Sequence, residues 1–127
     1  AHYESGWMAS SGDDGEVYLA TTQYFNILDN TWSTTIEMPT ARRYASCEHF
    51  LGNVVVIGGE AAGITSTAVV EALNLQSNTW STGTPLPEAR DDHATVALDG
   101  KLYVIGGGRF EDDQYVTVAS TLIGQLP

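Results

Sequence analysis

The segment Asn30-Thr31-Trp32-Ser33-Thr34 recurs unchanged as Asn78-Thr79-Trp80-Ser81-Thr82, without any gap between the aligned copies. Both copies are 48 residues apart, and a second landmark has the same spacing, because Val56-Ile57-Gly58-Gly59 recurs as Val104-Ile105-Gly106-Gly107. Three single residues also recur, and these are Pro39, Ala41 and Arg42, repeated as Pro87, Ala89 and Arg90. A period of about 20–50 residues is typical of proteins built from stacked copies of one structural unit. The repeat therefore decides the fold class before any local pattern is considered.

Each repeat contains four short segments that favour β-strands, which in the first copy are residues 45–50, 54–57, 68–73 and 79–81. Turn signals separate them. Asp99-Gly100 in the second copy favours a two-residue hairpin, since both central residues of a type I′ turn have positive φ. A four-stranded antiparallel sheet cannot bury both of its faces alone, so the copies have to pack against one another. Radial packing of four-stranded sheets gives a β-propeller.

The order of these landmarks resembles the kelch repeat. A hydrophobic strand ends in Gly-Gly, a further strand follows, and then come Asn-Thr-Trp, Pro and Arg before the next repeat. The spacing of about 48 residues agrees with the period of about 50 in that family. In departures from the pattern, Phe25 and Leu73 stand where kelch repeats often have Tyr, and Ala45 stands where the second copy has His93. The resemblance implies an all-β fold, namely a kelch-type β-propeller segment with four-stranded antiparallel blades.

The offset divides the chain into about two and a half blades. Residues 1–40 are predicted to form a partial blade that lacks its first strand, residues 41–88 a complete blade, and residues 89–127 a partial blade that lacks its fourth strand. Counting by the same offset places a second strand at Trp7-Met8-Ala9 and a third strand at Val116-Thr117-Val118-Ala119. Propellers close with about four to eight blades. Three interpretations therefore stay open: a segment of a longer protein, a ring completed by further copies, or an open array.

The charge of the chain excludes some classes of partner more readily than others. Its 16 acidic and 5 basic residues give a net charge of −11. A field of this sign repels phosphate backbones, which argues against nucleic-acid binding. No apolar stretch approaches the ~18–20 residues needed to cross a bilayer, so membrane insertion is not expected. The single lysine and the many Ser and Thr residues incline slightly towards a secreted or cell-surface protein, but the compartment stays open.

Two sets of recurring residues are predicted to be structural. Trp32 and Trp80 could stack on carbohydrate, but one large aromatic per sheet is what packing between blades requires. The double glycines Gly58-Gly59 and Gly106-Gly107 lack the Lys-Ser/Thr that follows in a phosphate-binding loop. They are expected instead to permit unusual dihedral angles or a close approach of backbone.

The connections between blades carry the candidate binding residues. In kelch substrate adaptors, which this chain resembles, arginines at this position line the mouth of the central channel and grip acidic peptides, a role that suits the rigid guanidinium fork. The alternative is a structural salt bridge or a carbonyl cap between blades. Side chains that differ between the copies are expected on the same rim. The candidates for this channel rim are Arg42, Arg43, Tyr44, Arg90, Asp91, Asp92, His93 and Arg109.

No constellation for catalysis or for a metal ion is visible in the sequence. Three acidic clusters, Asp13-Asp14-Gly15-Glu16, Asp91-Asp92 and Glu111-Asp112-Asp113, could offer oxygen ligands to calcium, but none has the alternating spacing of a calcium loop. The three histidines are scattered. Some kelch propellers are enzymes, including the galactose-oxidase type and sialic-acid mutarotases, but no residues here carry over to either.

The sequence therefore favours a non-catalytic module for protein–protein interaction or assembly, part of a larger propeller, without a cofactor or metal. Its partner would be another protein or further copies or blades of the same protein. The first alternative is a self-assembling structural protein of the extracellular space that forms a ring or a fibre. The second is a segment of a secreted, sugar-active kelch enzyme.

Overall fold

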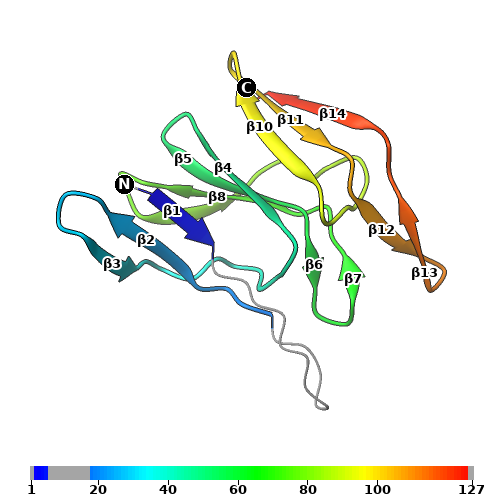
Figure 1. Ribbon diagram of the computed structural model, residues 1–127, viewed down its shortest axis with the longest axis horizontal. Helices are drawn as coiled ribbons and strands as arrows, with labels where there is room; N and C mark the ends of the chain where they lie inside the picture. The colour runs from blue at the N-terminus through cyan, green and yellow to red at the C-terminus, as the bar shows by residue number, and fades with distance from the viewer. Residues whose placement is uncertain (1, 6–17, 126–127) are drawn as a thin grey trace.

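The structure is a computed structural model that describes residues 2–5 and 18–125. Three antiparallel sheets form most of it. The sheets lie beside one another, and two short hairpins project from one end of them (Figure 1). No helix that could span a membrane is present among the described residues. This architecture confirms the all-β propeller segment predicted from the sequence.

Each sheet is a meander of short strands. The first sheet contains β1 (His2–Ser5), β2 (Thr22–Asn26) and β3 (Thr31–Thr34). The middle sheet contains β4 (Ser46–Phe50), β5 (Asn53–Ile57), β8 (Val70–Asn74) and β9 (Thr79–Thr82). The third sheet contains β10 (Ala94–Leu98), β11 (Lys101–Ile105) and β14 (Thr121–Gln125). The hairpins are β6 (Glu60–Ala61) with β7 (Thr65–Ser66), and β12 (Gly108–Glu111) with β13 (Gln114–Thr117).

The sequence repeat extends to the backbone hydrogen bonds that anchor each connecting link. In the first link the amide of Thr35 donates to the carbonyl of Thr22 at 2.9 Å. In the second link the amide of Gly83 donates to the carbonyl of Val70 at 2.8 Å, and both of these residues lie one full repeat further on. The links therefore satisfy their polar backbone against the third strand of the preceding sheet, which fixes where the next sheet begins.

The third strand of the third sheet lies later in the chain than a constant offset predicts. Val54 pairs with Leu73, so the offset would place Thr121 opposite Leu102, the equivalent of Val54. The residue that pairs with Leu102 is instead Gly124. The connection is thus three residues longer, and it forms the β12–β13 hairpin. The prediction of a third strand at 116–119 is wrong, because residues 116 and 117 belong to that hairpin and β14 follows it.

A similar shift affects the first sheet. Val55 pairs with Ala72 in the middle sheet, so a constant offset would place residue 7 opposite Tyr24, the equivalent of Ala72. The residue that pairs with Tyr24 is instead Tyr3, and the strand beside β2 is His2–Ser5. The predicted strand at Trp7-Met8-Ala9 lies outside the described residues.

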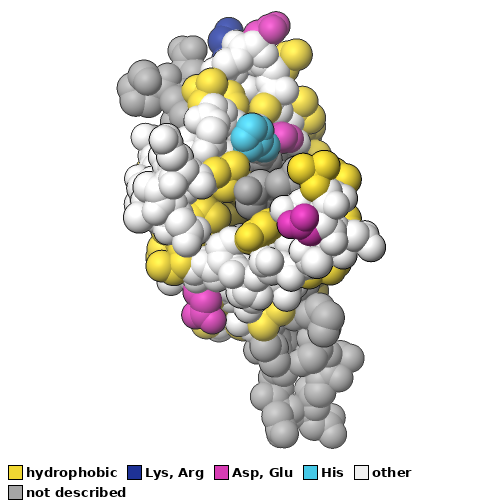
Figure 2. Space-filling view, turned by 90° about the vertical axis from the view of Figure 1, so that its left-hand side faces the viewer, with side chains coloured by type: hydrophobic (Ala, Val, Ile, Leu, Met, Phe, Trp, Pro, Cys, Tyr) yellow, Lys and Arg dark blue, Asp and Glu magenta, His cyan; other side chains and the backbone are white. Residues whose placement is uncertain are grey.

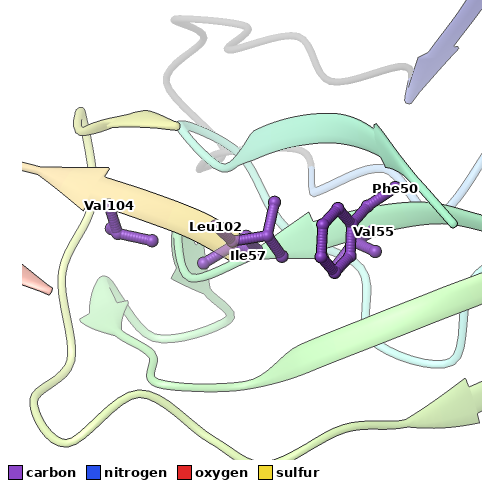
Figure 3. Packing of buried hydrophobic residues seen from close by; sticks show 5 residues of the cluster. All are labelled: Phe50, Val55, Ile57, Leu102 and Val104. Atoms are coloured by element: carbon purple, nitrogen blue, oxygen red, sulfur yellow. The ribbon is translucent and has the colours of Figure 1, made fainter. Parts of the chain in front are cut away.

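The largest group of buried hydrophobic side chains fills the space between the middle and third sheets. Phe50, Val55 and Ile57 of the middle sheet meet Leu102 and Val104 of the third sheet (Figure 3). All five are less than 9% exposed. Burial of such side chains stabilises a fold by roughly 1.5–3 kcal/mol each. These contacts bury apolar surface that neither sheet could bury alone.

Burial differs between equivalent strands because their neighbours differ. Residues 54–57 of β5 are all buried, since this strand lies between the first and third sheets. In β11 only Leu102 and Val104, which face the middle sheet, are buried, and Ile105 is 44% exposed. A strand that is covered on both faces loses the alternation seen in a strand covered on one face.

The double glycines lie where backbone approaches backbone. Gly58, Gly59, Gly106 and Gly107 all have positive φ, between 60° and 98°. A β-carbon on Gly59 would lie 2.6 Å from the carbonyl oxygen of Arg43 and 2.9 Å from the amide of Ala45. The link that precedes the middle sheet therefore passes so closely that only glycine fits.

The substitution Gly59→Ala should destabilise the fold by about 3 kcal/mol or more, because a strained φ of 98° and a backbone overlap act together. Gly52→Ala is the matched control. Gly52 also has positive φ, but a β-carbon there would contact nothing within 4 Å, so only about 1–2 kcal/mol of strain is expected. Urea unfolding of both variants measures the difference, and equal losses would contradict the close-approach argument.

Candidate functional site

Arg42 lies in the link before the middle sheet, and its side chain is completely buried. Its Nη1 donates hydrogen bonds to the carbonyls of Gly58 at 3.0 Å and Val69 at 2.8 Å. Its Nη2 pairs with the carboxylate of Glu71 in β8. Burial lowers the pKa of the guanidinium, and the Glu71 carboxylate opposes that effect. The side chain thus ties the end of the second strand to the start of the third.

Arg90 makes the equivalent contacts in the third sheet. Its Nη1 donates to the carbonyls of Gly106 at 3.1 Å and Ser120 at 3.0 Å. The Arg90 side chain is also completely buried. Its nearest ion-pair partner, Glu88, lies 4.0 Å away and is half exposed. Burial lowers the pKa of this guanidinium as well. Arg42 and Arg90 therefore both donate to backbone carbonyls of their own sheets, and their assignment to a binding rim stays a prediction.

Arg43 and Asp91, which follow the two arginines, make the same backbone contact but have different side chains. Arg43 and Glu60 exchange backbone hydrogen bonds of 3.0 and 2.7 Å, and Asp91 and Gly108 exchange equivalent bonds of 2.9 and 3.0 Å. In the first pair the Arg43 side chain also binds the Glu60 carboxylate, with Nε at 2.9 Å. Both of those side chains are almost fully buried. The scaffold is thus repeated, while the chemistry built on it changes.

Asp91 joins the two hairpins through hydrogen bonds. The hydroxyl of Ser66 in β7 donates to its carboxylate at 2.7 Å, and the hydroxyl of Tyr115 in β13 donates at 2.6 Å. Burial and this hydrogen bond raise the pKa of the Tyr115 phenol. The Tyr115 ring lies against Gly108 and contacts Phe110 edge to face, with centroids 5.1 Å apart. The absence of a side chain at Gly108 is what leaves room for the tyrosine.

Tyr44 and Asp92 are equivalent residues at the base of the hairpins, and both are accessible to solvent. Both have positive φ, 54° and 53°, which costs energy in residues other than glycine. The amide of Asp92 donates to the carbonyl of Tyr44 at 3.0 Å, and the Arg43 guanidinium lies 4.7 Å from the centroid of the Tyr44 ring. Burial and the charge of Asp91 raise the pKa of the Asp92 carboxyl.

Arg109 is held at the edge of the third sheet by two carboxylates. Its Nη1 donates to Glu88 at 2.9 Å and its Nε donates to Glu111 at 2.7 Å. Hydrogen bonding to Glu111 raises the pKa of this guanidinium. Its side chain is 25% exposed and both partners are half exposed, so its charge is largely balanced at the surface.

His93 lies between the first strands of the middle and third sheets. Its Nε2 is 2.7 Å from the hydroxyl of Ser46 in β4, and that hydroxyl is 2.5 Å from the hydroxyl of Thr95 in β10. The side chain is 9% exposed. Burial and the nearby charge of Arg90 lower the pKa of the imidazole. The residue therefore serves as a polar contact between sheets.

The two repeated tryptophans have different surroundings. Nε1 of Trp80 donates to the carbonyl of Ile36 at 3.0 Å, so this side chain contacts the link that leaves the first sheet. Trp32 packs against Phe25 of its own sheet, with ring centroids 5.2 Å apart, and is 55% exposed. Among the described residues, Trp80 therefore contacts the link of a neighbouring sheet.

Several residues of this end of the molecule were not singled out from the sequence: Tyr18, Glu60, Ser66, Glu71 and Tyr115. Tyr18 illustrates the reason. Its hydroxyl donates to Glu60 at 3.2 Å, although the two residues are far apart in the sequence. Apart from Glu71 in β8, these residues lie in loops and hairpins that do not repeat, so the constant offset gives no signal for them.

The potential metal ligands in the described part of the chain are not gathered in one place. Residues 18–125 contain no cluster of three or more His, Cys, Asp or Glu side chains that could hold an ion. The acidic cluster Asp13–Glu16 lies outside the described residues, as do the side chains of His2 and its strand.

Comparison with known families supports the sequence resemblance. The family model described as "Kelch motif" matches residues 41–87 and 89–119, which together make up more than half of the chain. The matched ranges begin within the links that carry Arg42 and Arg90. The first range extends across the middle sheet, and the second ends before β14. No curated protein matches the chain.

Replacing the buried arginine should test its structural role. We expect Arg42→Met to lower the free energy of unfolding by about 3–5 kcal/mol, because the buried Glu71 carboxylate would lose its cation and two carbonyls would each lose a donor. Arg109→Met, which removes an arginine whose ion pairs are exposed, should cost far less. Chemical denaturation distinguishes the two variants, and a small loss in Arg42→Met would show that the cap is dispensable.

The lowered pKa of His93 predicts a pH dependence of stability. Below the ordinary histidine pKa of 6.5 the unfolded chain takes up a proton at this position, whereas the folded chain resists it. The folded state is therefore favoured above pH 6.5, and this contribution is lost as the pH falls towards the lowered pKa. Unfolding free energies between about pH 7.5 and about pH 5 should fall more steeply for the native chain than for His93→Gln. Parallel curves would refute the assignment.

Proposed function

The chain belongs to the kelch family, and we propose that it is a non-catalytic protein-binding module whose recognition surface lies at one end of its sheets. We call this surface the hairpin end. It consists of the β6–β7 and β12–β13 hairpins together with Tyr44 and Asp92 at their base. Kelch motifs generally serve as protein-interaction modules in propellers, and the position of the surface is the part that this proposal adds.

The observation that carries the proposal is a fixed backbone with changing side chains. The bridge between Arg43 and Glu60 recurs as the bridge between Asp91 and Gly108, at nearly the same distances. The accessible residue beside it nevertheless changes from Tyr44 to Asp92. A rigid scaffold that presents variable loop residues is how binding surfaces are commonly built.

The composition of the hairpin end supports the same proposal. Large apolar side chains remain exposed there, namely Ile64 at 51%, Phe110 at 39%, Tyr115 at 45% and Val116 at 37%. Aromatic residues are enriched at the centres of protein interfaces, where they provide contact area at a low entropic cost. Arg109, one of the rim candidates, lies at the edge of this group and would contribute a polar rim.

Exposed apolar side chains are less concentrated on other parts of the surface. On the side of the molecule shown in Figure 2, hydrophobic side chains lie in small separate groups among polar ones, and charged side chains are few. The turns at the opposite end of the sheets, which close the β2–β3 and β4–β5 hairpins, expose Leu28 at 94% and Leu51 at 66%. These turns provide a matched control for the hairpin end.

The test starts from peptides selected from a random display library for binding to the 127-residue chain. Affinity for the selected peptides should fall at least about tenfold in Phe110→Ala, as for a hot-spot residue, and change less than about twofold in Leu28→Ala. The two variants remove similar apolar groups at opposite ends of the sheets, and circular dichroism would check that both remain folded. Loss of binding in Leu28→Ala alone, or failure to select any peptide, would contradict the proposal.

The other interpretations from the sequence stay predictions. They are assembly with further copies, the reading as a segment of a sugar-active enzyme, and the division into blades at residues 40 and 88. The exposed hydrophobic side chains of the third sheet, Val96, Leu98, Ile105 and Ile123, are compatible with a further sheet packing there.

A further inference from the structure

The β12–β13 hairpin, which stands beside β6–β7 at the end of the sheets (Figure 1), presents two aromatic rings beside a carboxylate. Phe110 and Tyr115 are a directly opposed cross-strand pair, so both side chains lie on the same face of the hairpin. The Tyr115 hydroxyl lies 2.6 Å from the carboxylate of Asp91 and 3.4 Å from that of Asp92. Phe110, Tyr115 and Asp92 are all exposed to solvent. One accessible face thus combines aromatic rings with a carboxylate.

The first hairpin shows how this combination can hold a cation. The Nε of Arg43 donates to the carboxylate of Glu60 at 2.9 Å. The same guanidinium lies 4.7 Å from the ring centroid of Tyr44 and 5.3 Å from that of Tyr18. A guanidinium within about 6 Å of an aromatic centroid is attracted to the negative face of the ring. The molecule itself therefore contains an arginine bound by a carboxylate and aromatic rings.

The second hairpin has no such cation at the equivalent place. Asp91 occupies the position of Arg43, since its backbone bridge to Gly108 repeats the bridge between Arg43 and Glu60. An anionic side chain has thus replaced a cationic one. Partial burial and the charge of Asp91 raise the pKa of the Asp92 carboxyl, and these effects outweigh the opposing charge of Arg43. The negative charge of Asp92 is therefore incompletely balanced.

The sequence contains five Lys and Arg residues, and the structure describes all of them: Arg42, Arg43, Arg90, Lys101 and Arg109. Arg42 and Arg90 are completely buried. Arg109 alternates with Phe110 along β12, so it lies on the other face of the hairpin, where Glu88 and Glu111 bind it. Lys101 begins β11 at the opposite end of the third sheet. Among the described residues, Asp92 forms no salt bridge.

The charge around this face favours a basic partner. Asp112 and Asp113 form the exposed turn of the hairpin, and the chain as a whole carries a net charge of −11. Complementary charge across an interface speeds association and selects against partners of like charge. The kelch resemblance alone would imply an acidic peptide, so the surface of this chain favours the opposite charge.

We propose that the hairpin end recognises a basic segment of a partner protein, with an arginine or lysine side chain in contact with the carboxylate of Asp92 and the rings of Phe110 and Tyr115. This inference rests on the proposed function of the hairpin end and adds the chemistry of its partner. The carboxylate supplies the opposite charge, and the rings supply apolar area and cation–π attraction. Asp112 and Asp113 attract further basic residues of the same segment.

The test examines the peptides selected from a random display library on the 127-residue chain. Arginine and lysine should be enriched in them at least about threefold over the starting library, because like-charged peptides are rejected. Asp92→Asn should weaken binding of these peptides at least about fivefold, because their cation loses its ionised partner. Asparagine tolerates the positive φ of 53° at this position, so the backbone is preserved.

Asp99→Asn is the matched control. Asp99 is also exposed and also has positive φ, 51°, but it lies in the turn between β10 and β11 at the opposite end of the sheet. The variant therefore removes the same charge from the chain without changing the hairpin end. Affinity for the selected peptides should change less than about twofold, since charges beyond roughly 10 Å are largely screened at moderate salt.

The outcomes separate this inference from the proposed function. The basic partner is wrong if the selected peptides show no excess of arginine and lysine, or if Asp92→Asn and Asp99→Asn bind them equally well. In either case a loss of affinity in Phe110→Ala would still identify the hairpin end as the binding surface. If Phe110→Ala leaves affinity unchanged, the proposed function fails and the basic partner fails with it.

Discussion

The contacts between buried arginines and backbone carbonyls are the constraint on which the rest of the structure depends. One carbonyl lies where the chain leaves the second strand of a sheet for its hairpin, and another lies where it returns to the third strand. A guanidinium from the link donates a hydrogen bond to both. To reach them, the link must pass directly over the double glycine. One cation thus fixes the strand ends, the path of the link and the need for glycine.

This arrangement explains why the framework and the accessible surface vary independently. The arginine acts on backbone atoms, so side chains in the neighbouring positions can change without disturbing it. Arg43 with Glu60 is an ion pair, while Asp91 at the equivalent position binds two hydroxyl groups. Both sets of contacts sit on the same backbone bridge. A surface built in this way can acquire new side chains while the sheets beneath it keep their packing.

The position of the candidate site could be predicted from the sequence more fully than its chemistry. The repeat identified the links, because Arg42 and Arg90 recur at a constant offset. It left their role open between binding and capping, and their burial, which depends on neighbouring sheets, favours capping. The repeat did not predict a role for Tyr115, because its hairpin is three residues longer than the one before it. A tyrosine in an inserted loop has no counterpart, so its contact with Asp91 exists only in the folded chain.

The sequence alone determined the repeating unit, since hydrophobic segments, turn residues and glycines at fixed spacing act locally and recur in both copies. It also determined where backbone would approach backbone, because only glycine permits positive φ with such close contact. Only the tertiary structure decided the lengths of the hairpins, the burial of the arginines and the difference between β5 and β11. These properties depend on what lies on either side of each sheet, and a pattern within one repeat does not contain that information.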